Sequence, residues 1–194
     1  MRIKALKSIK PVFFSSLDVA SALKISEASA RLTCHRYVKK GYLIRPKRDL
    51  YLLEENWASL GNPGQYALAN RLQVPSYVSF LTALSYHEIS TQVQKNFVES
   101  AAVTRTKKVE SVGWTFRYFK LAGKLYFGFT KKESFFIALP EKALLDALYL
   151  MSLSRYRLDW SALDIGKLNR RELKRMAIFF PERTRELARR LCKN

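Results

Sequence analysis

The sequence predicts an α+β fold in two parts, because two kinds of hydrophobic pattern follow one another along the chain. Apolar residues have helical spacing over about the first forty positions. Runs rich in aromatic and β-branched residues come later, and helical spacing then returns. A length of 194 residues with 48% apolar content is enough for two modest cores. We therefore expect an N-terminal domain over residues 1–56 and a larger α+β domain over residues 57–194.

Three short helices are expected before residue 41. The first is a short amphipathic helix that closes at Pro11, and Ser16 is placed to cap the second. Ser26 can cap the third helix. That helix should stop at Gly41, since a left-handed C-cap costs glycine almost nothing.

The third helix should have an apolar side and a cationic, hydroxyl-bearing side. Its apolar side is centred on Cys34 in a helical projection and includes Ala30. The polar side holds Ser29, Thr33, Arg36, Lys39 and Lys40. Residues 39–53 read KKGYLIRPKRDLYLL: the helix ends at Gly41, and a β-hairpin with several cations at its bend is expected to follow.

Helix, helix, basic helix and cationic hairpin is the order of a winged helix-turn-helix, whose third helix enters the major groove of double-stranded DNA. We expect Arg36 and Ser29 to read bases, and Arg45, Lys47 and Arg48 to contact phosphates. The full set of predicted DNA-binding residues is Ser26, Ser29, Thr33, Arg36, Lys39, Lys40, Arg45, Lys47 and Arg48. The alternative is that the lysines and Arg48 form an ordinary solvated surface, since a helix C-terminus alone favours cations.

The net charge of +19 indicates an anionic partner, and 35 Lys and Arg stand against 16 Asp and Glu. The excess is spread over the chain: 12 basic and 5 acidic residues in 1–56, 11 and 6 in 57–153, and 12 and 5 in 154–194. Nucleic acid, an acidic membrane surface and an acidic protein all fit this charge. The basic terminal helices lack the Trp-rich or Phe-rich face of a membrane anchor, and no apolar run is long enough for a span.

A cytoplasmic location is expected from the two cysteines. Cys34 and Cys192 lie far apart in a chain that shows no signal peptide, a pattern typical of reduced thiols. We expect no disulfide.

The second part should contain a small, largely antiparallel sheet packed by helices. Turn chemistry at residues 62–64 suggests the boundary, and a short helix is expected directly after it. Strands are expected at 76–80, 97–104, 113–121, 124–130 and 133–139, with the strand at 113–121 buried on one face and wet on the other. A helix starting at Pro140 should cover the sheet.

Two basic helices broken by Pro181 are expected to end the chain. Their apolar positions, such as Leu173 and Ala177, should point inward. Their outer faces then carry more positive charge than solubility requires. These residues form a predicted basic C-terminal surface of Arg170, Arg171, Lys174, Arg175, Arg185 and Arg189.

Two blocks of sequence resemble the AbiEi family of antitoxins from bacterial type IV toxin–antitoxin systems, which act in abortive infection. They are PSYVSFLTALSYHEI at residues 75–89 and ALPEKALLDALYL at residues 138–150. With the capped helices and basic wing, the resemblance covers most of residues 12–153 and does not extend to 154–194. It implies a winged helix that binds the promoter of its own operon. It also implies a second domain that counters a nucleotidyltransferase-like toxin.

An enzyme is not expected. His35 and His87 have no paired catalytic partner, and two Cys and two His lack metal-site spacing, so we predict no metal and no cofactor. A phosphate-binding glycine loop is missing too. A nuclease built on Glu99, Glu110 and Glu133 is one alternative. The main alternative is a winged-helix transcriptional regulator whose second domain senses a ligand or dimerises.

Overall fold

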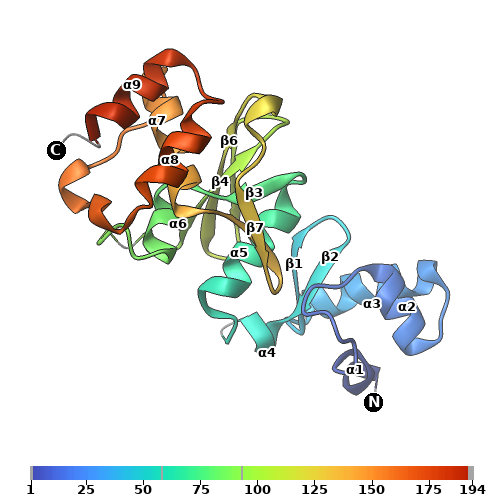
Figure 1. Ribbon diagram of the computed structural model, residues 1–194. Helices are drawn as coiled ribbons and strands as arrows, with labels where there is room; N and C mark the ends of the chain where they lie inside the picture. Colours follow the sequence, from blue (N-terminus) through green and yellow to red (C-terminus); the bar gives the residue numbers. More distant parts are fainter. Residues whose placement is uncertain (1, 58, 93, 192–194) are drawn as a thin grey trace. The chain divides into compact units, whose positions relative to one another are not determined.

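The structure, a computed structural model, describes residues 2–57, 59–92 and 94–191 and divides into two compact units, Met1–Gly64 and Gln65–Asn194 (Figure 1). The predicted α+β class is confirmed. The α-helices are α1 (Arg2–Leu6), α2 (Ser16–Leu23), α3 (Glu27–Lys39), α4 (Glu54–Trp57), α5 (Gly61–Leu72), α6 (Phe80–Tyr86), α7 (Pro140–Ser152), α8 (Arg170–Ala177) and α9 (Glu182–Leu191). The strands are β1 (Leu43–Lys47), β2 (Leu50–Leu53), β3 (Ser76–Val78), β4 (Phe97–Ala102), β5 (Lys107–Ser111), β6 (Trp114–Lys120), β7 (Phe129–Lys132) and β8 (Phe135–Ala138).

The first unit has the arrangement of a winged helix. Helices α2 and α3 pack on each other, and β1 and β2 form an antiparallel hairpin. Phe14 pairs with Tyr51 through two backbone hydrogen bonds of 2.9 and 2.8 Å, which adds a short third strand to the hairpin. Its core consists of Leu6, Phe14, Val19, Ala20, Ala30, Cys34, Leu43, Tyr51 and Leu53.

The caps of α2 and α3 follow local sequence rules. Ser15, and not the predicted Ser16, caps α2, because Asp18 stands three positions after Ser15 and completes a reciprocal capping box with it. Ser26 caps α3 by accepting a hydrogen bond from the Ser29 amide. Gly41 follows the end of α3 with φ +74°, as predicted.

Residues 62–64 are not the predicted turn. They lie in the first turns of α5, which starts at Gly61. Proline is tolerated there, since the first amides of a helix have no partner within it. The chain divides between Gly64 and Gln65, so this helix begins in one unit and continues in the other.

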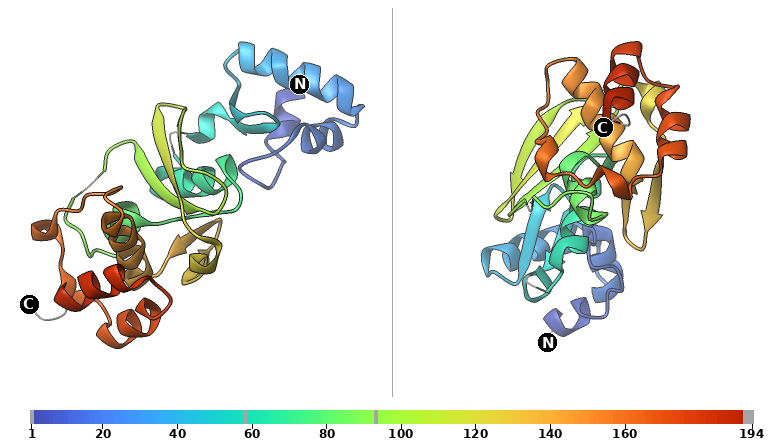
Figure 2. Two further views of the ribbon diagram at one scale, coloured as in Figure 1. Left: turned by 90° about the horizontal axis from the view of Figure 1, so that it is seen from above. Right: turned by 60° about the vertical axis from the view of Figure 1, so that its left-hand side comes forward.

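The second unit is built on a mixed sheet with the strand order β5-β6-β4-β3-β8-β7 (Figures 1 and 2). Among the described residues three of its five pairings are antiparallel, and β3–β8 and β4–β6 are parallel. The edge strand β5 was not predicted, because its sequence KKVES reads as a lysine-rich break. Part of the strand expected at 124–130 is a 3-10 helix, η1 (Gly123–Leu125).

Helices cover both faces of this sheet. Tyr118 of β6 points to α5, where its hydroxyl donates to the Ala69 carbonyl at 2.7 Å. Its neighbour Phe119 points to the other face and packs on Phe80 of α6, with ring centroids 4.8 Å apart. The predicted wet face of this strand is therefore wrong near its C-terminal end, where Phe119 is buried, whereas Arg117 at its centre is exposed.

Helices α8 and α9 both pack on α7, and the three are grouped in both views of Figure 2. Short 3-10 turns, η2 (Trp160–Ala162) and η3 (Ile165–Lys167), lead into α8. Within the residues described, no helix has the length and apolar content to cross a membrane. Cys34 is a free buried thiol, whereas Cys192 lies outside the described residues.

Candidate nucleic-acid interface

The outward side of α3 forms a continuous ridge. Ala30 and Cys34 are fully buried under the helix. Leu32, His35, Arg36 and Lys39 are exposed on the opposite side, which their spacing of three and four places together. Ridges of this kind fit the major groove of B-DNA, which is wide enough to admit a helix.

Thr33 is a correction to the predicted site. It is only 4% exposed, and its hydroxyl donates to the Ser29 carbonyl one turn earlier at 2.8 Å. The reason is its position beside Ala30 around the helix, at the border of the packed side. Its hydroxyl therefore has no access to a base.

Ser26 and Ser29 stand together at the N-terminus of α3. The Ser26 hydroxyl accepts from the Ser29 amide at 3.2 Å and lies 3.0 Å from the Ser29 hydroxyl. Ser26 is thus committed to capping. Ser29 keeps an exposed hydroxyl at the positive end of the helix dipole, a position that suits a phosphate oxygen.

Arg36 lies along the ridge, with its Nε 3.4 Å from the Leu32 carbonyl. A contact of that length is weak and leaves the guanidinium available. Arg31 forms a 2.6 Å ion pair with Glu27 on the same helix. Lys39 and Lys40 extend the basic character to the C-terminal end, where both are exposed.

Sequence reasoning missed Leu32 as a member of this surface. Its side chain is 64% exposed, which is unusual for a leucine in a helix that also has a core. An apolar side chain at this place can contact a thymine methyl group. The sequence spacing could have placed Leu32 on the outward side. Ala28, Leu32 and Lys39 follow the spacing i, i+4, i+11, which lies opposite Ala30.

The wing carries its cations on exposed positions. Arg45, Lys47 and Arg48 are all exposed, and Arg48 and Asp49 form the turn between β1 and β2. The pairing register shifts between Ile44 and Lys47, an irregularity typical of a β-bulge. The Arg45 guanidinium lies 6.0 Å from the centre of the Tyr51 ring.

Asp49 is the one acid at the turn of the wing, and it has a structural role. Its Oδ1 accepts a hydrogen bond from the backbone amide of Ser16, in the first turn of α2, at 2.9 Å. Asp49 has φ +55°, a left-handed conformation that aspartate tolerates in turns. Hydrogen bonding from Ser16 lowers the pKa of the Asp49 carboxyl, and the charges of Arg31 and Arg45 add to this effect.

Cys34 is structural. Burial raises the pKa of its thiol to about 11, so the thiol is protonated at neutral pH and is a poor nucleophile or metal ligand. Among the described residues no group of three His, Cys, Asp or Glu side chains could hold a metal ion.

The three glutamates considered for a nuclease have separate roles. Glu99 is buried and accepts a 2.6 Å hydrogen bond from the Tyr156 hydroxyl. Burial raises its pKa, and hydrogen bonds from Tyr156 and Gln94 oppose that rise. Glu110 forms an ion pair with Lys108, and Glu133 is exposed in a turn. No metal-binding carboxylate cluster forms from them within the described part of the chain.

A buried polar network joins residues 75–89 to residues 138–150. Lys142 and Asp146 of α7 are both completely buried and form an ion pair. The Lys142 ammonium also donates to the Tyr77 hydroxyl at 2.7 Å. Asp146 accepts from Tyr77 at 2.9 Å and from Ser79 at 2.7 Å. All partners are satisfied, so the network joins α7 to β3 and offers no open site.

The predicted basic C-terminal surface divides into paired and unpaired cations. Arg175 pairs with Glu172, and Arg185 and Arg189 both pair with Glu182. The other three cations are exposed on α8 and form no ion pair with any described residue. They are Arg170, Arg171 and Lys174.

No protein-family model and no curated protein sequence matches the chain. Among solved structures, the crystal structure of the RV2827C protein from Mycobacterium tuberculosis is similar, with a TM-score of 0.61 and 11% sequence identity. The match covers 96% of this chain and 73% of that one. At this identity the likeness establishes a shared fold over nearly the whole chain.

Proposed function

We propose that this protein is a non-enzymatic, DNA-binding antitoxin that represses its own operon and counters a nucleotidyltransferase-like toxin. The observation that carries the DNA-binding part is the exposed ridge of α3 beside a wing whose exposed side chains are cationic. Arg36 and Leu32 supply base-reading chemistry. Arg45 and Arg48 supply phosphate contacts.

The antitoxin part of the proposal rests on the resemblance of residues 75–89 and 138–150 to the AbiEi family. Both blocks contribute to the buried network of Tyr77, Ser79, Lys142 and Asp146. The matching residues therefore support the framework of the second unit.

The test of DNA binding is a gel-shift series with the DNA upstream of the protein's own gene. We expect a specific complex that survives competition by random DNA at physiological salt. Equal competition by random and upstream DNA would contradict a repressor. The Arg36→Ala substitution should weaken the specific complex with upstream DNA more than binding to random DNA.

The test of antitoxin activity is growth of cells that express the neighbouring nucleotidyltransferase-like toxin from a promoter this protein does not control. We expect the full chain to restore growth. The Arg36→Ala variant should restore growth equally, because the toxin promoter in this experiment is not repressed by the protein. Failure of both proteins would limit the function to repression.

The second candidate is a regulator whose second domain senses a ligand, and one observation favours it. A hollow of about 410 Å³ in the second unit is lined by Leu81, Gln94, Glu99, Arg117, Ser154, Arg155, Tyr156 and Arg157. Three guanidinium groups at one hollow suit an anionic ligand. In that case a small phosphorylated metabolite should change operator affinity, and Arg155→Ala with Arg157→Ala should abolish the response.

A further inference from the structure

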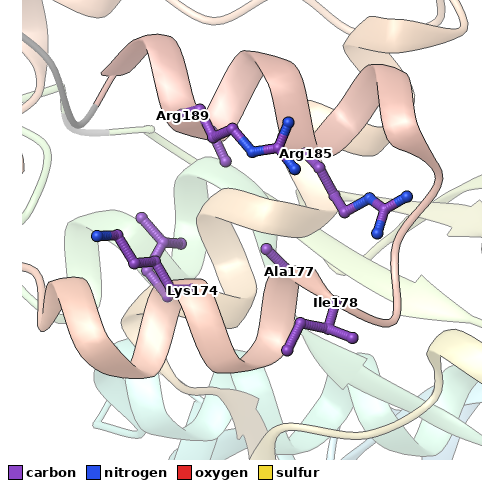
Figure 3. Close-up of a pocket in the computed structure, with 7 residues that line it drawn as sticks. Lys174, Ala177, Ile178, Arg185 and Arg189 are labelled. Atoms are coloured by element: carbon purple, nitrogen blue, oxygen red, sulfur yellow. The ribbon is translucent and has the colours of Figure 1, made fainter.

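Helices α8 and α9 enclose a groove of about 420 Å³ on the second unit (Figure 3). Its lining combines small or branched apolar side chains with three cations. The lining residues are Leu173, Lys174, Ala177, Ile178, Arg185, Ala188 and Arg189.

The floor of the groove is apolar, and an apolar edge extends from it to the surface. Leu173, Ala177 and Ala188 are buried at the floor. Ile178 is 67% exposed, and the next residue, Phe179, is 60% exposed. Two large exposed apolar side chains in sequence, beside an apolar groove, are typical of a binding surface.

The rims of the groove are positively charged on both sides. Lys174 stands on α8, and Arg185 and Arg189 stand on α9 across from it (Figure 3). Glu182 pairs with both arginines, and its single negative charge leaves that rim with a positive excess. Lys174 has no ion pair among the described residues, so its charge is available to a partner.

We propose that this groove is the docking site for an acidic amphipathic helix of a partner protein. Apolar side chains at spacing i and i+4 would fill the groove and cover Ile178. Asp or Glu residues on the two flanks of that helix would face Lys174 on one rim and Arg189 on the other. This charge complementarity selects an acidic partner and steers its approach.

Two other occupants fit less well. A second copy of this chain would bring a protein of charge +19 against a basic groove, and like charges there are unfavourable. Nucleic acid would satisfy the cations, but a phosphate backbone gives no apolar group to the floor of Leu173, Ala177 and Ala188.

The experiment uses the full chain and a fluorescein-labelled helical peptide of about 18 residues, with leucines at i, i+4 spacing on one face and glutamates elsewhere. A second peptide has the same composition in scrambled order, so its charge is identical. Fluorescence anisotropy should show binding of the first peptide that is about tenfold tighter or more than that of the scrambled peptide. Equal binding of the two would overturn the proposal, because a diffuse attraction to a cationic protein would then suffice.

Substitutions at the groove test its location. Ile178→Asp should weaken binding of the amphipathic peptide by about tenfold, and Lys174→Glu by about fivefold. The matched controls are Val74→Asp, at a valine 71% exposed outside the groove, and Arg170→Glu, on the same helix but outside the groove lining. Both controls should change binding by less than about twofold. Equal effects of the groove and control substitutions would overturn the proposal.

A third arm replaces the peptide by a single-stranded oligothymidylate of similar length. Its binding should be insensitive to Ile178→Asp. If oligothymidylate loses as much affinity as the peptide on this substitution, the groove is a nucleic-acid site and the protein-docking proposal is wrong. Every variant in this experiment lies outside α3 and the wing, so loss of peptide binding and loss of operator binding are independent results.

Discussion

The Asp49 carboxylate at the turn of the wing accepts a hydrogen bond from the Ser16 backbone amide in the first turn of α2, 33 positions earlier in the chain. This contact ties the wing to the positive end of a helix, where a carboxylate is favoured. It fixes the wing turn while the neighbouring cations stay exposed.

Asp49→Ala should lower the free energy of unfolding by about 1 kcal/mol, because a hydrogen bond to a charged group contributes about 1.5 to 3 kcal/mol and solvent at this exposed site reduces that value. The pKa of Asp49 is lowered in the folded protein. Its contribution is therefore present at neutral pH, above the carboxyl's unfolded pKa, and is lost as the pH falls through the folded pKa. Urea unfolding over a pH series measures this. Glu54→Ala, which removes an exposed acid with no ion pair in the described residues, is the control and should give a smaller change.

Arg36→Ala should weaken binding to operator DNA by about 1 to 3 kcal/mol and binding to random DNA much less. The reason is that a guanidinium on the outward ridge of α3 can form two hydrogen bonds with one guanine. Gel shifts on both DNAs at one salt concentration measure the difference. An equal loss on both would assign Arg36 to phosphate contact.

Lys47→Ala combined with Arg48→Ala should flatten the dependence of log affinity on log salt by about one to two counterions. Both side chains are exposed at or next to the wing turn. Titrations at several salt concentrations give the slope. An unchanged slope would show that the wing does not touch DNA, and Arg170→Ala with Arg171→Ala is the charge-matched control on the other unit.

Thr33→Val should leave operator affinity unchanged, because the Thr33 hydroxyl is buried and bonds to its own helix. Ser29→Val, one turn earlier and exposed, should weaken it. Fluorescence anisotropy with operator DNA compares the two. If Thr33→Val lowered operator affinity without changing the stability of the protein, Thr33 would be part of the DNA interface.

Lys142→Met should destabilise the protein by about 3 to 5 kcal/mol, since it leaves the Asp146 carboxylate buried without its cation. The chain offers a matched control in Arg31→Met, which breaks the Glu27–Arg31 pair with the same i, i+4 spacing but at the surface. The control should cost about 0.5 kcal/mol or less. Similar midpoints in urea for the two variants would contradict the burial argument.

Local rules predicted much of the winged helix from the sequence. Ser26 and Gly41 mark the ends of α3 because capping depends on residues within one turn. The predicted cap Ser16 was wrong because the residue three positions after it is Val19, whereas Ser15 has the acid Asp18 at that spacing. The prediction that Thr33 contacts DNA was wrong because a helical projection cannot show whether a residue at the border between two faces is buried.

Features that depend on tertiary contacts could not be predicted. The strand β5 has a lysine-rich sequence, and its pairing comes from its neighbour β6. The strand at 113–121 was predicted to have one wet face, but Phe119 is buried because Phe80 of α6 packs against it. The α8–α9 groove needs the packing of two helices on a third. The basic residues at its rims were predicted as one surface. The sequence did not predict that Glu182 would form ion pairs with Arg185 and Arg189 and leave Lys174 without one in the described part of the chain.

The network of Tyr77, Ser79, Lys142 and Asp146 also bears on how this sequence can diverge. It fixes the register of α7 against β3, because sliding the helix by one turn would bury charges among apolar groups. Single substitutions at Lys142 or Asp146 leave an uncompensated ion, whereas a joint exchange of both for apolar residues removes the problem. Lineages that have lost one of these two ions should therefore have lost the other as well, and the remaining hydroxyls at positions 77 and 79 should have changed with them.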